Sequence, residues 1–178
     1  MASVSMFNYW THRKPVTTLT GPTRVRFFDD GTANVATAYG NWNDLYTSGG
    51  ALPDNRNGQV TGLFFSFRNV GSVWTEAAMK LAHECINNAS LELTVGGVLV
   101  QRGPLWAFCR PPEWAFGATG SASGFVQNGG YQLQTAAHPY LSQQTLSVEL
   151  VIPQAQTTMT TLAPAVTIQT YDTRTVGI

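Results

Sequence analysis

One stretch of the chain, residues 75–100, constrains the fold more than any other because the spacing of its apolar residues changes within it. The first part repeats apolar residues every three to four positions, which is the pattern of an amphipathic helix. These residues are Ala78, Leu81, Ala82 and Cys85. Residues 90–95 then alternate between apolar and polar, as in a strand, and Gly96-Gly97 supplies a turn. The stretch therefore predicts one short helix, at about residues 74–88, followed by a β-hairpin.

The rest of the chain carries short alternating segments separated by turn residues, and the sequence predicts about eight strands in all. Outside the hairpin, the segments with strand patterning are residues 23–28, 59–70, 131–135, 146–152 and 165–171. Asp172-Thr173 is expected to turn the chain into a last short strand. The predicted fold is all-β, a jelly-roll-like antiparallel β-sandwich with the one helix inserted. Phe64 and Val148 lie in the most continuous apolar segments and are expected in its core.

The chain carries few charges, with 10 Lys or Arg and 10 Asp or Glu among its 178 residues. This is 11% of the chain, where about 25% is usual. The formal net charge of zero argues against a dedicated nucleic-acid binder, because such proteins are usually basic. A solitary soluble protein normally keeps more charge on its surface. Two interpretations follow: either partners cover much of the surface, or the surface is neutral and rich in Thr, Gln and Asn.

The length predicts a single domain, residues 22–178, preceded by an arm at residues 1–21. The first residues lack the basic and apolar segments of a secretory signal, and no apolar run has the length of a membrane span. The protein is therefore expected to fold in a cytoplasm. Cys85 and Cys109 form no Cys-x-x-Cys pair and are predicted to be buried free thiols.

The arm combines aromatic and basic residues. They are Phe7, Tyr9, Trp10, Arg13 and Lys14. Pro15 and Gly21-Pro22 discourage regular structure in this region. The composition leaves two interpretations open: the arm contacts a neighbouring subunit, a membrane surface or nucleic acid, or it packs on its own domain.

The sequence contains no motif for catalysis. Nucleophilic catalysis needs Ser or Cys beside a base, but none of the three histidines, at positions 12, 83 and 138, lies in such a motif. Paired carboxylates serve in glycoside hydrolysis, and the obvious pairs are Asp29 with Asp30 and Glu84 with Glu92. Each of these acids has a simpler role in a turn, on a helix face or on a strand face. We therefore predict no catalytic, cofactor-binding or metal-binding residues, no small-molecule substrate and no enzymatic activity.

The later half of the chain has a recognisable order of segments. The hairpin at residues 90–100 leads into Gly103-Pro104-Leu105-Trp106 and a glycine-rich loop. A strand at residues 146–150 and a final hairpin at residues 166–176 follow. This order, over about residues 60–178, resembles the single-jelly-roll capsid proteins of tailless icosahedral bacteriophages.

The resemblance implies a virion structural protein that builds an icosahedral shell with copies of itself and with other virion proteins. It implies no catalysis and no cofactor, and a location in the virion after folding in the host cytoplasm. The 20 aromatic residues, 5 Trp, 6 Tyr and 9 Phe, suit contacts between subunits. The alternative is a receptor- or glycan-binding spike or lectin-like sandwich. Its stacking platforms would be Trp42, Tyr46, Trp106 and Trp114.

Overall fold

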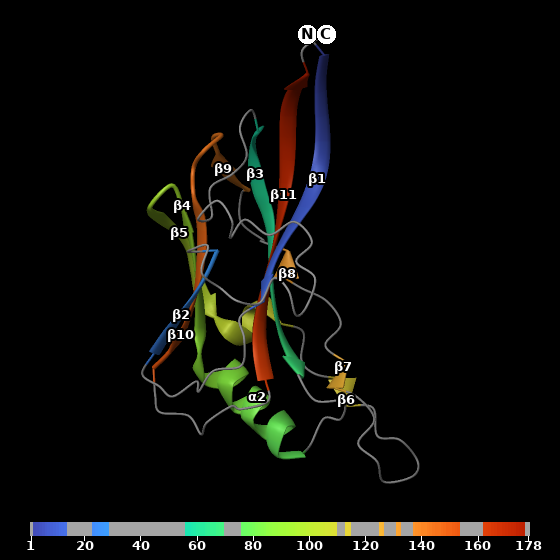
Figure 1. Ribbon diagram of the computed structural model, residues 1–178. Helices are drawn as coiled ribbons and strands as arrows, with labels where there is room; N and C mark the ends of the chain where they lie inside the picture. The colour runs from blue at the N-terminus through green and yellow to red at the C-terminus, as the bar shows by residue number, and fades with distance from the viewer. Residues whose placement is uncertain are drawn as a thin grey trace.

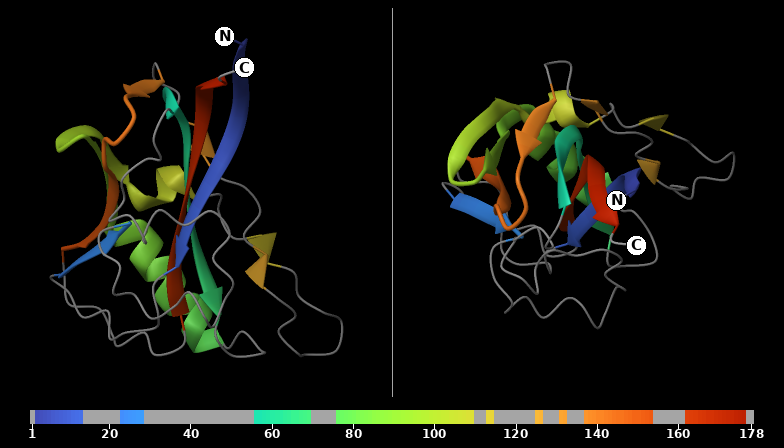
Figure 2. Two further views of the ribbon diagram at one scale, coloured as in Figure 1. Left: turned by 45° about the horizontal axis from the view of Figure 1, so that its top comes forward. Right: turned by 90° about the horizontal axis from the view of Figure 1, so that it is seen from above.

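The computed structural model of the chain contains two antiparallel β-sheets and, among the residues it describes, one α-helix. The described residues are 2–13, 23–28, 56–69, 76–109, 113–114, 125–126, 131–132, 137–153 and 162–176. The two sheets face each other as the layers of a sandwich, which the view from above shows most clearly (Figure 2). The expected all-β sandwich with an added helix is confirmed at this level.

The first sheet has five strands and the second has four. The first sheet contains β1 (Ala2–Arg13), β3 (Arg56–Asn69), β8 (Tyr131–Gln132), β9 (His138–Tyr140) and β11 (Leu162–Val176). The second contains β2 (Thr23–Phe27), β4 (Ser90–Val95), β5 (Val98–Pro104) and β10 (Leu146–Ile152). Their orders are β1-β11-β3-β8, with β9 also paired to β3, and β2-β10-β4-β5 (Figure 1). A separate ribbon consists of β6 (Glu113–Trp114) and β7 (Phe125–Val126).

A bulge at Thr61 decides which side chains of β3 face the second sheet. The register with β11 pairs Gly62 with Gln169 but Val60 with Thr170, so Thr61 is an extra residue in the ladder. Its hydroxyl donates to the carbonyl oxygen of Gln169 at 3.3 Å. The bulge shifts the alternation of β3 by one residue, so the core-facing positions change from even to odd numbers.

The shift places Phe64 outside the core, and the prediction for this residue is wrong. Leu63, Phe65 and Phe67 are fully buried, whereas Phe64 is half-buried on the opposite face of the sheet. Its ring lies over Gly62, where an added Cβ would come within 2.9 Å of it. Neighbouring residues of a strand point to opposite faces, so an unbroken apolar run does not reveal which members face the core.

The second sheet follows its sequence pattern closely. Every second residue of β10 is buried, and the prediction that Val148 lies in the core is confirmed. The buried residues of this strand are Leu146, Val148, Leu150 and Ile152. In the register with β4, Leu150 lies opposite Leu91, which is also fully buried. The turn between β4 and β5 uses Gly96 and Gly97, whose φ angles of 57° and 83° suit glycine.

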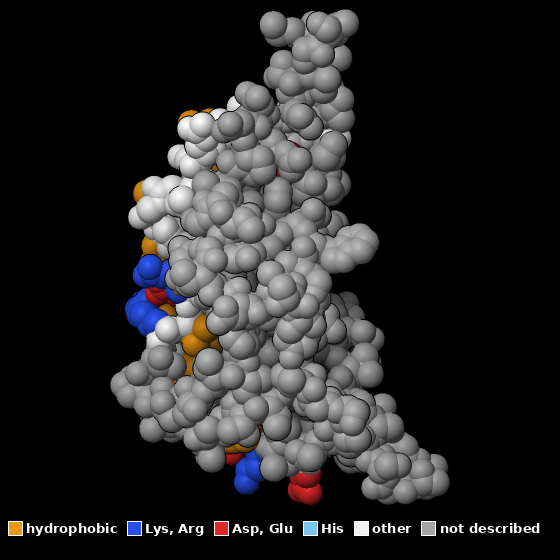
Figure 3. Space-filling model, in the orientation of Figure 1, with side chains coloured by type: hydrophobic (Ala, Val, Ile, Leu, Met, Phe, Trp, Pro, Cys, Tyr) orange, Lys and Arg blue, Asp and Glu red, His pale blue; other side chains and the backbone are white. Residues whose placement is uncertain are grey.

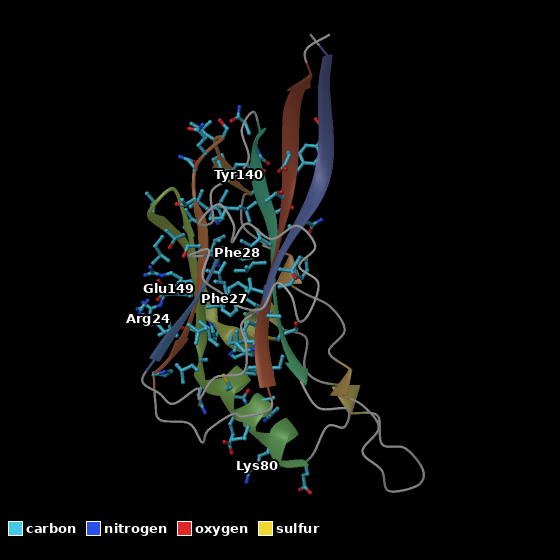
Figure 4. All side chains as sticks on the ribbon, in the orientation of Figure 1. Arg24, Phe27, Phe28, Lys80, Tyr140 and Glu149 are labelled. Atoms are coloured by element: carbon cyan, nitrogen blue, oxygen red, sulfur yellow. The ribbon has the colours of Figure 1, made fainter. Side chains whose placement is uncertain are left out.

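The end of β2 brings two successive phenylalanines into the core. Phe27 and Phe28 are both buried, although successive strand residues normally point to opposite faces. Phe28 has a φ of 60°, so the strand ends there and the backbone turns its side chain inwards. Both rings lie between the two sheets (Figure 4).

The helix α2 (Glu76–Asn88) agrees with the predicted helix at about residues 74–88. Ala82, Cys85 and Ile86 belong to the buried core cluster, so the apolar side of the helix covers one end of the sandwich (Figure 1). The helix packs beside η2 (Leu105–Phe108), a short 3-10 helix. At its end the Ala89 amide donates to the Cys85 carbonyl at 2.9 Å.

Residues 2–13, which the sequence assigned to an arm, form the strand β1 at one edge of the first sheet. The strand pairs with β11 along its whole length, from Ala2 opposite Val176 to Arg13 opposite Ala165. The expectation of irregular structure there is wrong for this segment, because Pro15 comes after the strand has ended. The upper ends of β1 and β11 extend beyond the other strands (Figure 1). Residues 14–22 lie outside the described residues, so the boundary at residue 21 stays a prediction.

Candidate functional site

Charged residues gather in one row across the outer face of the second sheet. The strand registers place Arg26 of β2 opposite Glu149 of β10. Glu149 in turn lies opposite Glu92 of β4, and Glu92 lies opposite Arg102 of β5. We call these four residues, with Arg24 of β2, the charged row. Its side chains form the blue and red cluster in Figure 3.

Arg24 joins the two carboxylates of the charged row. Its Nη1 donates to Glu92 Oε2 at 2.8 Å and to Glu149 Oε2 at 2.6 Å. Arg26 Nε donates to Glu149 Oε1 at 2.8 Å, and Arg102 Nε lies 3.3 Å from Glu92 Oε1. Like charges directly opposite in a sheet repel, so the two glutamates need these arginines. Arg24 and Glu149 point away from the core (Figure 4).

The protonation of the charged row follows from these contacts. Partial burial raises the pKa of Glu149, but the hydrogen bonds from Arg24 and Arg26 outweigh it, so this pKa lies below its ordinary value. The hydrogen bonds to Glu149 and Glu92 raise the pKa of Arg24. With all five groups ionised, three arginines and two glutamates leave one net positive charge. The three guanidinium side chains are each more than half exposed.

The charged row differs from the carboxylate pairs that the sequence suggested. Glu92 lies opposite Glu149 in the sheet, whereas its suggested partner Glu84 belongs to α2. Asp29 and Asp30 lie outside the described residues. Glycoside hydrolysis needs one carboxyl group with a raised pKa as the acid, whereas the pKa of Glu149 is lowered. The row holds strands together through its ion pairs and presents guanidinium groups to solvent.

Two histidines, His83 and His138, have side chains that the structure describes. His83 Nδ1 lies 3.2 Å from Asn87 Nδ2 on the exposed face of α2. His138 of β9 is half-buried, and its Nε2 has no hydrogen-bond partner among the residues that the structure describes. The His12 side chain is not among those described. Within the described residues, no three His, Cys, Asp or Glu side chains form a group that could hold a metal ion.

Both cysteines are buried and neither is in a disulfide, as the sequence predicts. Burial raises the pKa of the Cys85 thiol to about 12. At neutral pH this residue is therefore almost entirely the thiol, which is a poor nucleophile. Cys85 contributes to the core rather than to chemistry.

A buried polar pair lies near the end of the first sheet, and the sequence patterns missed it. Asp172 is fully buried in β11 and accepts a hydrogen bond from the hydroxyl of Tyr140. The predicted turn at Asp172-Thr173 is wrong, because β11 continues to Val176. Gly58 of β3 lies between the two residues in the register. The sequence carries only a weak signal for this buried pair, because Asp followed by a polar residue is typical of turns.

Exposed apolar side chains gather at the end of the sandwich where two turns meet. Val98 is 64% exposed, Leu99 52% and Leu141 62%. The Gly96 amide donates to the Thr145 carbonyl at 2.9 Å, which ties the β4–β5 turn to the segment between β9 and β10. Solvent exposure of several large apolar residues at one end is typical of a contact surface.

Of the four aromatic residues proposed as stacking platforms, Trp106 is the one whose side chain is described. It lies on η2 and is 58% exposed. Trp42 and Tyr46 lie outside the described residues, as does the side chain of Trp114. An exposed indole offers a flat apolar face together with an N–H donor.

Comparison with known proteins finds no family model that matches the chain and no matching curated relative. Among the described residues, no helix has both the length and the apolar character needed to cross a membrane. The function therefore has to be argued from the fold and from the surfaces described above.

Proposed function

We propose that this chain is a jelly-roll subunit of a viral shell, which assembles with copies of itself and with other virion proteins. The observation that carries the proposal is the order in which the strands pair. Counting from the two ends of the chain inwards, β1 pairs with β11 and β2 with β10. Next, β3 pairs with β8 and β9, and last, β4 pairs with β5.

Nested pairing of this kind is what a long antiparallel hairpin produces when it is rolled up. Successive pairs alternate between the two sheets: β1–β11 in the first, β2–β10 in the second, β3 with β8 and β9 in the first, and β4–β5 in the second. This connectivity supports a jelly roll, a double-sheet fold that viral capsid proteins, lectins and cupins use. The strand order thus supports the fold that the sequence resemblance implied.

A fold by itself does not determine function, so the choice of a shell subunit rests on further observations. Charged residues make up only 11% of the chain. Apolar side chains are exposed at one end of the sandwich, at Val98, Leu99 and Leu141. Both features favour a surface that neighbouring subunits cover. In this proposal the protein acts by assembly rather than by catalysis, and membrane or genome contacts belong to residues near the N-terminus.

Particle formation tests the proposal directly. The purified full-length chain is brought to conditions of rising protein and salt concentration, and is examined by sedimentation and electron microscopy. Closed particles or regular capsomers of uniform size support the proposal. A chain that stays monomeric throughout, both alone and with the other proteins of its virion, refutes it.

The second candidate function is glycan binding by a lectin-like sandwich, and exposed Trp106 is the observation that favours it. An indole face stacks well on the apolar face of a sugar ring. Glycan-array binding that Trp106→Ala abolishes would support this candidate over the shell subunit. Leu141→Ala is the matched control, because it removes an exposed apolar side chain that lies outside η2 and is not one of the four proposed platforms.

A further inference from the structure

We propose that the outer edge of β1, which no other described strand pairs with, is an interface with a second copy of this chain, formed by antiparallel pairing of the two β1 strands. The inference rests on the proposed function and extends it by naming one contact of the subunit. An edge strand presents unpaired N–H and C=O groups, which invite pairing with another chain. Proteins that stay apart usually protect such edges with charges, prolines, bulges or short strands.

The other described edges carry this protection. β2 is only five residues long and places Arg24 and Arg26 on its exposed face. β5 contains Arg102 and ends at Pro104. β8 has two residues, and β9 has three with Pro139 at its centre. Each of these strands is therefore a poor template for a further strand.

The edge strand β1 has none of these features along most of its length. It is 12 residues long and contains no proline, glycine, lysine or acid, and its single arginine is its last residue, Arg13. Its register with β11 runs without a bulge, and within the described part of the chain β11 is its one partner strand. About half of its backbone N–H and C=O groups point away from β11, since these groups alternate along a strand. The difference between β1 and the protected edges is the reason for assigning the interface here.

The position of Arg13 at one end of β1 favours antiparallel over parallel pairing of two copies. Parallel pairing of two copies would bring Arg13 beside Arg13, and like charges opposite each other are unfavourable. Antiparallel pairing places Arg13 of each copy near Ala2 of the other and keeps the two arginines apart. The two arginines then lie roughly 35 Å apart at about 3.4 Å per residue. The arrangement has two-fold symmetry and joins the first sheets of the two copies into one continuous sheet.

Charge placed at the middle of β1 tests this interface. Asn8 lies near the centre of the strand, so two-fold pairing brings the two copies of residue 8 close together. Asn8→Lys and Asn8→Glu are each expected to raise the dissociation constant of the dimer about tenfold, measured by sedimentation equilibrium of the full chain. An equimolar mixture of the two variants is expected to recover wild-type affinity, because lysine then faces glutamate. Val98→Lys on the edge strand β5 is the matched control and should leave the affinity unchanged.

Several results would overturn the proposal. Loss of dimerisation in Val98→Lys but not in the Asn8 variants moves the interface to β5. Failure of the Lys and Glu variants to complement each other points to an occupant other than a second copy. Hydrogen exchange gives a check that needs no variant: the outward amides of residues 2–13 should become protected only as protein concentration rises. Protection at every concentration shows that another part of the same chain covers the edge.

The same experiments separate this interface from the proposed function. If dimerisation responds to the Asn8 variants but particles never form, the β1 interface is supported and the proposed shell function is refuted. If particles form equally well from wild type and from Asn8→Lys, the shell function is supported and the β1 interface is refuted.

Discussion

At the scale of single residues, the two faces of β3 separate neighbouring phenylalanines. Phe65 is buried and meets Phe67 edge to face, with ring centroids 5.0 Å apart, whereas Phe64 is half-buried on the other face. Phe65→Ala is expected to lower the free energy of unfolding by about 3–5 kcal/mol. Phe64→Ala, the matched control, should cost clearly less. Urea denaturation of both variants measures the difference, and equal losses would contradict the facing that the Thr61 bulge produces.

Gly58 is a second residue whose environment decides its identity. A Cβ at this position would overlap the carbonyl oxygen of Tyr171 and come within 2.9 Å of the Tyr140 hydroxyl. Gly58→Ala is therefore expected to destabilise the protein by about 1–3 kcal/mol, through overpacking next to the buried Tyr140–Asp172 pair. Gly97→Ala provides a comparison, because Gly97 has open space around it and only its φ of 83° opposes a side chain. An unchanged denaturation midpoint in Gly58→Ala would show that the strands at this end are farther apart.

At the scale of the strands, the charged row couples all four members of the second sheet and makes their stability depend on pH. The folded pKa of Glu149 lies below its ordinary value, which is about 4.3 in an unfolded chain. Its contribution is therefore fully present above about pH 4.3 and is lost as pH falls through the lower folded pKa. Glu149→Gln should cost about 1 kcal/mol at neutral pH, and its difference in stability from wild type should shrink as pH falls below about 4.3.

Thermal melts of wild type and Glu149→Gln across this pH range make the measurement. Glu84→Gln serves as the control, since it removes a carboxylate from the helix instead of the sheet. A difference between wild type and Glu149→Gln that does not change with pH would mean that the arginines contribute no net stabilisation to the glutamate.

At the scale of the whole molecule, β1 links the stability of the sandwich to its assembly. Deleting residues 1–14 removes the strand that pairs with β11 over its full length. The remaining second sheet, helix and core cluster are expected to keep a cooperative fold with a lower melting temperature. The deletion should also reduce particle yield, because the β1 edge is then absent. Normal particle yield from the truncated chain would exclude residues 1–14 from assembly.

Elements whose patterns are local could be predicted from the amino-acid sequence. The spacing of apolar residues located α2, and Gly96-Gly97 located the β4–β5 turn. The alternation of β10 predicted that Val148 is buried. Each of these patterns depends on residues a few positions apart, so the chain carries it before any tertiary contact forms.

Features that depend on contacts between residues distant in the chain could not be predicted in this way. The bulge at Thr61 becomes visible in the register of β3 against β11, and it alone excludes Phe64 from the core. Asp172 has the local pattern of a turn residue. Inside the sandwich, however, it accepts a hydrogen bond from the hydroxyl of Tyr140, 32 positions away. No local pattern pairs Glu92 with Glu149, and the two become neighbours because β4 and β10 pair. Strand pairing is set by the burial and hydrogen bonding of the whole molecule, which no local period encodes.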